Sequence, residues 1–321
     1  MGYSLLEHVR KSCQQVAEMA THVHIRDDLI PNYALTLAMS RKDKSQMDFT
    51  AHYQGTDEDT LAYYFVLGAI NFGSGYFPHL RKRAGMSGYY TIASSLSDHF
   101  RNKVLKPTDL LEIKARECFS IFGQDPHNPT VYELMDLYAL SMNELGKYVM
   151  TLYNGNFANV VEAANCSAVR LVEILIGMPY FRDVTYYRGM DVAFFKRAQI
   201  MAADLSLAFG GQGFGKFDDL PRLTIFADNL VPHVLRLDGI LEYNPELSWR
   251  IDSEEIIPSG SAEEIEIRAC ALNAVEQMVA AMGGLERGMS AMLLDNILWH
   301  RGQQPYYKQT KPRHRTRTVY Y

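Results

Sequence analysis

The chain has 321 residues, of which 47% are hydrophobic and 21% are charged, and its formal net charge is −5. A chain of this length and composition can bury a large core, which excludes an intrinsically disordered protein. The mildly acidic charge also argues against a general attraction to nucleic acid or to membrane surfaces.

The N-terminal residues and the cysteines indicate the compartment. MGYSLLEHVRKSCQQVAEMA has an amphipathic helical pattern with interspersed charges, unlike the apolar centre of a signal peptide. No run of about 18 apolar residues follows it. The four cysteines lie far apart without a C-x-x-C pair, which is typical of neither a disulfide framework nor a zinc site. We therefore expect a cytoplasmic protein with reduced thiols in its core.

Helical periodicity dominates the rest of the chain. A Ser/Thr-x-x-acidic pattern is typical of the first turn of a helix. It occurs from Thr56 to Asp59, from Thr130 to Glu133 and from Ser261 to Glu264. SAVRLVEILIG and FFKRAQIMAADLSLAF also have helical patterns. In the helix that follows Ser261 we expect one apolar stripe, formed by Ile265, Ala269, Leu272, Val279 and Met282.

Alternation typical of strands is scarce. The best candidates are THVHIR, near residue 21, and the final TRTVYY. His22 and His24 would share one face of the first strand, where two imidazoles could bind a metal, but no third ligand lies nearby and an edge strand fits better. We predict a mostly helical fold with minor β content. Because no repeat or linker divides the chain, we predict a single domain over residues 1–321.

One loop and one charged segment stand out. NFGSGYF, residues 71–77, follows an apolar helix and is rich in helix-breaking residues, which favours a C-capping loop. Its Asn71 could alternatively hydrogen-bond a ligand. KQTKPRHRTR, residues 308–317, holds five basic residues and no acid, and the remainder of the chain has a net charge of −10. Such a basic segment either docks on the acidic body or binds an anion.

Asp228 is the only ionisable residue in the first half of an apolar segment, LTIFADNLVPHVLRLDGIL. A buried carboxylate without a partner is costly, so this residue needs an explanation. A helix could begin here with Asp228 as its N-cap, since Asp is among the preferred N-cap residues. Alternatively, the helix is broken near Pro232, and Asp228 lies at the rim of an apolar pocket, where a developing positive charge would feel it strongly.

Several segments together resemble a known family. In chain order they are FFKRAQIMAADL, LTIFADNLVPHVLRLDGILEY, EEIEIRACALNAVE, LLDNILW and HRTRTVYY, preceded in the N-terminal half by YYFVLGAINF, SGYYTIASSL and YFRDVTYYRG. The chain thereby resembles the queuosine salvage protein family, the queuosine 5′-phosphate N-glycosylases. The resemblance implies a helical fold similar to the helix-hairpin-helix DNA glycosylases. It also implies hydrolysis of queuosine 5′-phosphate to ribose 5-phosphate and queuine, which is salvaged into tRNA modification.

The resemblance carries the catalytic aspartate of the family's F-A-D motif onto Asp228, with Phe226 beside it. Cleavage of an N-glycosidic bond builds positive charge on the ribose. A carboxylate below C1′ can stabilise that charge and then orient or activate water. The leaving 7-deazaguanine has carbon in place of N7 and cannot be protonated there, which makes Asp228 more important than its counterpart in a purine hydrolase.

The substrate's other groups predict further contacts. Queuine carries a secondary ammonium and a cyclopentenediol, for which LLDNILWH offers Asp295, Asn296 and His300. In the family the position of His300 is more often acidic, and Asp295 could instead be a capping or surface carboxylate. For the phosphate, Lys196, Arg197 and the basic segment are candidates. The alternative for Arg197 is an exposed ion pair with Asp204, worth about 0 to 1 kcal/mol.

We expect no cofactor, no metal, no direct nucleic-acid contact and no membrane contact. The expected partner is the small-molecule substrate, and the sequence indicates no oligomeric state. Two other classes remain open. A DNA or RNA base-excision glycosylase would suit the implied fold, but a duplex binder should show an extended basic face, whereas this body is acidic. In a non-enzymatic helical interaction module, Asp228 would merely cap a helix.

Overall fold

The computed structural model describes residues 4–39 and 47–321. Its contacts divide the chain into two compact units. The first unit comprises residues 1–45, 183–196 and 221–317, and the second comprises residues 46–182, 197–220 and 318–321. Each unit is thus assembled from segments far apart in sequence. The single domain predicted over residues 1–321 stays a prediction.

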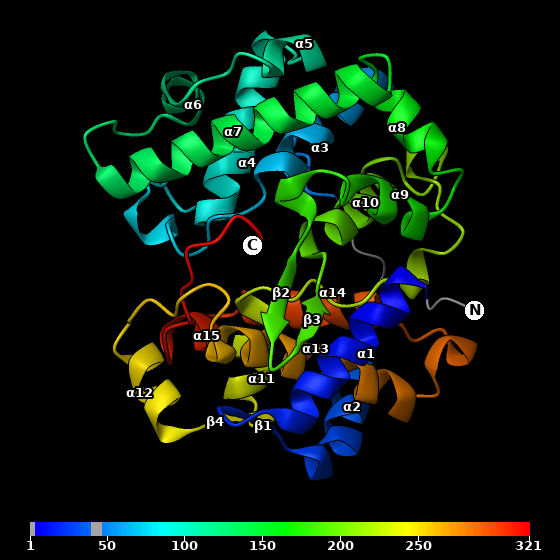
Figure 1. Ribbon diagram of the computed structural model, residues 1–321, viewed down its shortest axis with the longest axis vertical. Coiled ribbons are helices and arrows are strands. Elements are labelled where there is room, and N and C mark those ends of the chain that lie inside the picture. The colour runs from blue at the N-terminus through cyan, green and yellow to red at the C-terminus, as the bar shows by residue number, and fades with distance from the viewer. Residues whose placement is uncertain (1–3, 40–46) are drawn as a thin grey trace. The chain divides into compact units, whose positions relative to one another are not determined.

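The first unit is helical and carries two small antiparallel strand pairs (Figure 1). Its helices are α1 (Leu5–Met19), α2 (Ile30–Met39), α11 (Leu230–Leu237), α12 (Pro245–Asp252), α13 (Ala262–Ala281), α14 (Ala291–Gly302) and α15 (Pro305–Gln309), with 3-10 turns η1 (Asp27–Leu29) and η6 (Gly284–Arg287). The longest of them, α13, contacts α1, α2, α11 and α14, and so forms the centre of this unit.

The residues of α13 explain its central position. Ser261 caps the helix as predicted, since its hydroxyl accepts the Glu264 amide at 3.3 Å. Every side chain from residue 264 to 272 is buried, whereas Val279 and Met282 are only half-buried. The predicted apolar stripe is therefore confirmed at Ile265, Ala269 and Leu272, although neighbouring elements cover the other faces there as well, and it was wrong at the C-terminal end, where solvent reaches the helix.

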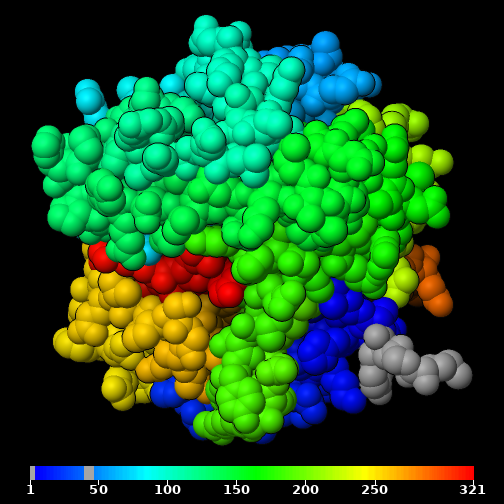
Figure 2. Space-filling model, turned by 45° about the horizontal axis from the view of Figure 1, so that its top comes forward, coloured from blue at the N-terminus to red at the C-terminus, as the bar shows by residue number. Residues whose placement is uncertain are grey.

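Short strands complete the first unit. β1 (Val23–Ile25) pairs with β4 (Leu241–Tyr243), which confirms the strand predicted in THVHIR. β2 (Val184–Tyr187) and β3 (Met190–Ala193) form an unpredicted hairpin. Its turn residues, Arg188 and Gly189, have φ angles of 45° and 93°, as a tight two-residue turn requires. Figure 2 shows this hairpin in light green beside α1 in blue, and β3 contacts α1.

The basic segment docks within the first unit. Lys311 pairs with Asp252 at 2.7 Å, and Arg315 pairs with Glu254 at 3.2 Å. The Arg315 carbonyl accepts the Ile257 amide at 2.8 Å. Of the two alternatives for this segment, docking is therefore observed. The strand predicted in TRTVYY, residues 316–321, was wrong: these residues belong to no strand, and an isolated bridge between Ile256 and Arg315 precedes them.

All regular secondary structure among the described residues of the second unit is helical. Its helices are α3 (Asp57–Ile70), α4 (Gly88–Asn102), α5 (Pro107–Leu110), α6 (Ala115–Phe122), α7 (Pro129–Leu152), α8 (Phe157–Ala163), α9 (Ala168–Leu175) and α10 (Lys196–Ala208), the last with its first residue in the first unit. The 3-10 turns are η2 (Phe77–His79), η3 (Pro179–Phe181), η4 (Gly213–Gly215) and η5 (Leu220–Arg222), which also crosses a unit boundary. The long helix α7 contacts α3, α5 and α6 (Figure 1).

Helix starts in the second unit match the sequence patterns unevenly. Thr56 caps α3 as predicted, with its hydroxyl accepting the Asp59 amide at 3.2 Å. The start predicted at Thr130 was wrong by two residues. The Asn128 side chain accepts the amides of Thr130 and Val131, and Pro129 occupies the first helical position. Asn is a preferred cap and Pro fits the first turn, so this pair takes precedence over the Thr-x-x-Glu pattern.

The mostly helical class is confirmed. All four cysteines are free thiols, and three of them are buried, as expected. In the part of the chain that the structure describes, no helix has the length and apolar character needed to span a membrane.

Candidate functional site

Asp228 lies between a buried segment without regular secondary structure, residues 223–227, and the start of α11. Its side chain is half-buried, and Oδ1 accepts the Leu230 amide at 2.6 Å. The N-cap position itself belongs to Asn229, whose side chain does not cap. The N-cap position predicted at Asp228 was therefore wrong by one residue, although the Asp228 side chain does cap the first amide of α11 from the preceding position. Pro232 lies in the first turn of α11, where backbone amides have no partner within the helix. It therefore does not break the helix.

Capping uses one oxygen of this carboxylate. Among the described residues, no hydrogen-bond donor contacts Oδ2 of Asp228. The two interpretations of Asp228, as a cap and as a reactive group, are therefore compatible, because the helix amide orients the carboxylate through Oδ1 and leaves Oδ2 for other chemistry.

Asp295 joins the same segment from α14. Its Oδ1 accepts the Phe226 amide at 2.8 Å, and its side chain is 5% exposed. Burial raises the pKa of Asp295 to about 7, the Phe226 amide and Lys196 act to lower it, and the negative charge of Asp228 raises it further. Asp295 is thus neither a surface carboxylate nor a helix cap. Near neutral pH it is present in both protonation states.

Two cations accompany the two acids. Lys196, the first residue of α10, is buried, and its charge acts on Asp295. Arg313, in the basic segment, is half-buried. Burial lowers the pKa of Arg313 and the charge of Asp228 raises it. Four segments of the first unit, remote in sequence, thus bring two carboxylates and two cations into electrostatic contact.

A buried ion-pair cluster lies behind Asp228. Arg268 of α13 donates from Nε to the Ala227 carbonyl at 2.9 Å. Its Nη atoms pair with Asp183 at 2.5 and 3.1 Å and with Glu264 at 3.3 Å. The sequence reading missed this cluster. The available signal was the spacing of Glu264 and Arg268, which lie four residues apart on one face of α13.

The remaining candidates of the first unit lie near this group or on α14. Phe226 is buried and contributes its backbone amide to Asp295. Asn296, next to Asp295, is half-buried. His300 is exposed, and its Nδ1 contacts the Asn296 carbonyl of its own helix at 2.8 Å. The helical turn therefore presents His300 on a different face from Asp295.

Arg197 belongs to the second unit and has a structural environment. Its side chain is 1% exposed and donates to the carbonyls of Tyr180 and Val319, both at 2.7 Å, and of Gly68 and Ala69. The rings of Phe72 and Phe181 flank the guanidinium at 4.7 Å. The exposed ion pair with Asp204, considered as an alternative, was wrong. A guanidinium that joins three separate backbone segments holds the unit together.

Asn71, also in the second unit, is the C-cap of α3, and its amide donates to the Gly68 carbonyl at 3.5 Å. The predicted C-capping loop is thereby confirmed. A ligand contact of the Asn71 side chain stays a prediction.

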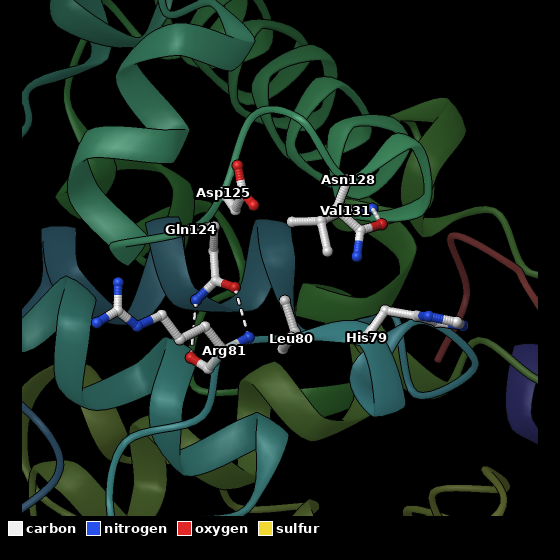
Figure 3. A pocket seen from close by; sticks show the side chains of 7 residues that line it. All are labelled: His79, Leu80, Arg81, Gln124, Asp125, Asn128 and Val131. Atoms are coloured by element: carbon white, nitrogen blue, oxygen red, sulfur yellow. Dashed lines mark hydrogen bonds between the residues drawn. The ribbon is translucent and has the colours of Figure 1, made fainter.

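The second unit contains a cavity of about 480 Å³ lined by His79, Leu80, Arg81, Gln124, Asp125, Asn128 and Val131 (Figure 3). The Gln124 amide spans it and exchanges hydrogen bonds of 3.0 and 3.1 Å with the backbone of Arg81. No residue predicted for the site lines this cavity. These two hydrogen bonds connect the loop before α7 with the segment after η2.

The Asp228 group has the components for one type of chemistry. A half-buried carboxylate with a free oxygen can stabilise a developing cation, and its effect is stronger in a site of low dielectric. A second carboxylate with a pKa near 7 can accept or donate a proton, or pair with an ammonium. The nearby cations can hold an anion.

Comparisons with known proteins agree with this chemistry. The family model described as "Queuosine salvage protein" matches residues 51–321. A protein of Sphaerobacter thermophilus is 37% identical over 98% of this chain and 97% of its own length. One of Dictyostelium discoideum is 31% identical over 98% of each chain, and one of Mus musculus is 29% identical over 84% of each. All three are named queuosine 5′-phosphate N-glycosylase/hydrolase. The chain belongs to the queuosine salvage protein family.

Proposed function

We propose that this protein hydrolyses the N-glycosidic bond of queuosine 5′-phosphate and releases queuine for salvage into tRNA modification. The names of its relatives support the reaction. The observation that carries the proposal is the Asp228 carboxylate, oriented by the Leu230 amide through one oxygen while the other has no donor among the described residues.

In the proposed mechanism, the free oxygen of Asp228 faces C1′ of the ribose. As the bond to the base lengthens, positive charge grows on the sugar ring, and the fixed carboxylate stabilises it without reorganising. The same carboxylate then orients or activates the water that completes hydrolysis. The Leu230 amide holds the oxygen of Asp228 that does not react, so the geometry is set before substrate binds.

Asp295 is assigned to the secondary ammonium of queuine. In the absence of ligand its burial keeps the pKa near 7. A cation placed beside it favours the ionised form, so binding at neutral pH should drive Asp295 to lose its proton. The residue would thereby select for the charged side chain of queuine. Asn296, Phe226 and Asn71 stay predicted contacts, and His300 has the weakest support because it is exposed on another face.

For the 5′-phosphate, Lys196 is the preferred residue, with Arg313 second. Both act electrostatically on the acids of this site, whereas Arg197 is committed to backbone carbonyls. A phosphate remote from the breaking bond supplies binding energy that can hold the ribose in a reactive position. A fold similar to the helix-hairpin-helix DNA glycosylases, and a cytoplasmic location, are further proposals that rest on the family resemblance and on the sequence.

The test is to incubate the protein with queuosine 5′-phosphate, queuosine, purine nucleotides and damaged DNA, and to detect free bases by mass spectrometry. We expect queuine from queuosine 5′-phosphate, and none from Asp228→Asn. Release of a damaged base from DNA, without release of queuine, would support base excision instead. Release of no base from any substrate would favour an interaction module.

A further inference from the structure

Arg268 is buried in α13, the central helix of the first unit, and contacts the segment that carries Asp228. Its side chain is 2% exposed, and the ring of Phe194 lies 3.8 Å from its guanidinium carbon. The Nε bond to the Ala227 carbonyl points in one direction and the Nη bonds to Asp183 and Glu264 in another. The planar guanidinium therefore fixes the relative positions of three chain segments.

The hydrogen bond to Ala227 matters because residues 223–227, which lead to Asp228, are not held by the hydrogen bonds of a helix or a strand. Residues 223–227 belong to no helix or strand, so their carbonyls lack ladder partners. Ala227 immediately precedes Asp228, and its carbonyl belongs to the planar peptide unit that also contains the nitrogen of Asp228. A shift of this carbonyl would therefore rotate the aspartate. Phe226, one residue earlier, is held in turn by Asp295.

Asp183 extends the arrangement to the proposed phosphate residue. Its carboxylate pairs with Arg268 and also accepts the backbone amide of Lys196 at 3.4 Å. Its carbonyl accepts the Phe194 amide at 3.0 Å. One buried ion pair thus connects the peptide before Asp228 with the first residue of α10.

Stability alone is a weak reason for such a cluster. Burying an arginine with two carboxylates carries a large desolvation cost, and apolar replacements of buried ion pairs are often neutral or stabilising. A role in catalysis explains the cluster better. It fixes the separation of the segments that carry Asp228 and Lys196, and a misplacement of about 1 Å can reduce a rate on the order of a hundredfold.

We infer that Arg268 is a positioning residue for hydrolysis: through the Ala227 carbonyl it orients Asp228, and through Asp183 it fixes the start of α10 at Lys196. The inference rests on the proposed function. It predicts that weakening the guanidinium contacts lowers the catalytic rate even in protein that remains folded.

The test compares Arg268→Lys with Glu266→Gln. Lys keeps the charge but donates from a single nitrogen, so it lacks the planar fork with which Arg268 reaches Ala227 and Asp183 from separate atoms. Glu266 lies two residues away on α13 and is equally buried, yet its carboxylate holds the amides of Thr21 and His22 and the Tyr187 hydroxyl, remote from Ala227 in the contact network. Glu266→Gln thus measures the effect of general destabilisation. Kinetics on queuosine 5′-phosphate are normalised to the folded fraction from thermal melts.

We expect Arg268→Lys to lower kcat about tenfold or more beyond Glu266→Gln, with KM changed less than about threefold. Asp183→Asn, which weakens the same bonds more mildly, should lower kcat and also raise KM because Lys196 loses its anchor. If Arg268→Lys does not fold, the kcat of Asp183→Asn tests the positioning role instead. Queuine binding should persist in both variants.

The outcomes separate the two proposals. Wild-type protein that releases no queuine refutes the proposed function. Wild-type activity together with equal kcat losses in Arg268→Lys, Asp183→Asn and Glu266→Gln refutes the positioning role of Arg268 and leaves the proposed function standing.

Discussion

The Asp295 carboxylate of α14 accepts the backbone amide of Phe226 at 2.8 Å, two residues before Asp228. The two acids are 67 positions apart in the sequence, and this bond places the second acid on the segment that carries the first. Burial raises the pKa of Asp295 to about 7, and the nearby charge of Asp228 raises it further. Asp295 therefore titrates near neutrality beside the carboxylate that is proposed to stabilise the developing cation.

Asp228→Asn should abolish turnover while preserving the fold. The amide oxygen of Asn can still accept the Leu230 amide, but the charge that stabilises the oxocarbenium-like state is gone. We expect kcat to fall about a hundredfold or more, with queuine affinity and the melting temperature little changed. Asp228→Ala is the matched control and should additionally lose about 1 kcal/mol of stability with the cap. Near-normal turnover by the Asn variant would return Asp228 to a purely structural role.

Asp295→Ala should affect ligand selection. If Asp295 pairs with the queuine ammonium, the variant loses far more affinity for queuine than for 7-deazaguanine, which lacks that group. Calorimetric titration with both ligands measures the difference. Equal losses for the two ligands would assign Asp295 to the ring or to support of Phe226.

The titration of Asp295 also predicts a pH dependence of stability. The folded pKa, about 7, lies above the unfolded value, so this group's stabilising contribution is complete below the unfolded pKa and is lost as the pH rises through 7. Asp295→Asn cannot ionise and should escape that loss. Its melting temperature relative to wild type should rise from pH 4 to pH 8. A constant difference over this range would contradict the raised pKa.

Lys196→Ala should reduce the preference for the 5′-monophosphate over free queuosine. A charge-assisted contact to phosphate is worth roughly 1.5–3 kcal/mol, so we expect a loss of about tenfold to a hundredfold in kcat/KM on the phosphate and little change on the nucleoside. Arg313→Ala should have a smaller effect in the same direction. Lys308→Ala, exposed in the same basic segment, is the control at matched salt. Equal reductions for both substrates would remove Lys196 from the phosphate site.

Arg197→Ala should act on stability. Its removal leaves the carbonyls of Gly68, Ala69, Tyr180 and Val319 without their shared donor in the interior of the second unit. The Gly68 and Ala69 carbonyls keep the Asn71 amide and the Ser141 hydroxyl as donors, but each of the other two acceptors left unpaired costs roughly 1–3 kcal/mol, so the variant should melt at a markedly lower temperature. The ratio of activities on phosphate and nucleoside, measured on the folded fraction, should stay unchanged. A selective loss on the phosphate with normal stability would restore Arg197 as a substrate contact.

The sequence by itself determined the helical class, the starts of α3 and α13, the strand at THVHIR and the family, because these depend on local patterns. Helix periodicity and a capping residue act over one or two turns, and a family motif is contiguous. The Asp228 segment was also marked locally, as one carboxylate in an apolar run. The hairpin of β2 and β3 escaped notice because VTYY and MDVA show no regular alternation of apolar and polar residues.

Only the tertiary structure decided what each charged residue contacts. Lys196 and Arg197 are adjacent in the sequence, yet the first acts on the acids near Asp228 and the second donates to backbone carbonyls of the second unit. Successive helical positions point about 100° apart, so neighbours enter different environments. Likewise, the sequence places Arg268 four residues after Glu264, as in many surface ion pairs, and does not show that both are buried. Arg268 is buried because neighbouring elements cover every face of α13 at this point. A buried guanidinium needs hydrogen-bond acceptors, and tertiary packing decides which acceptors lie near it.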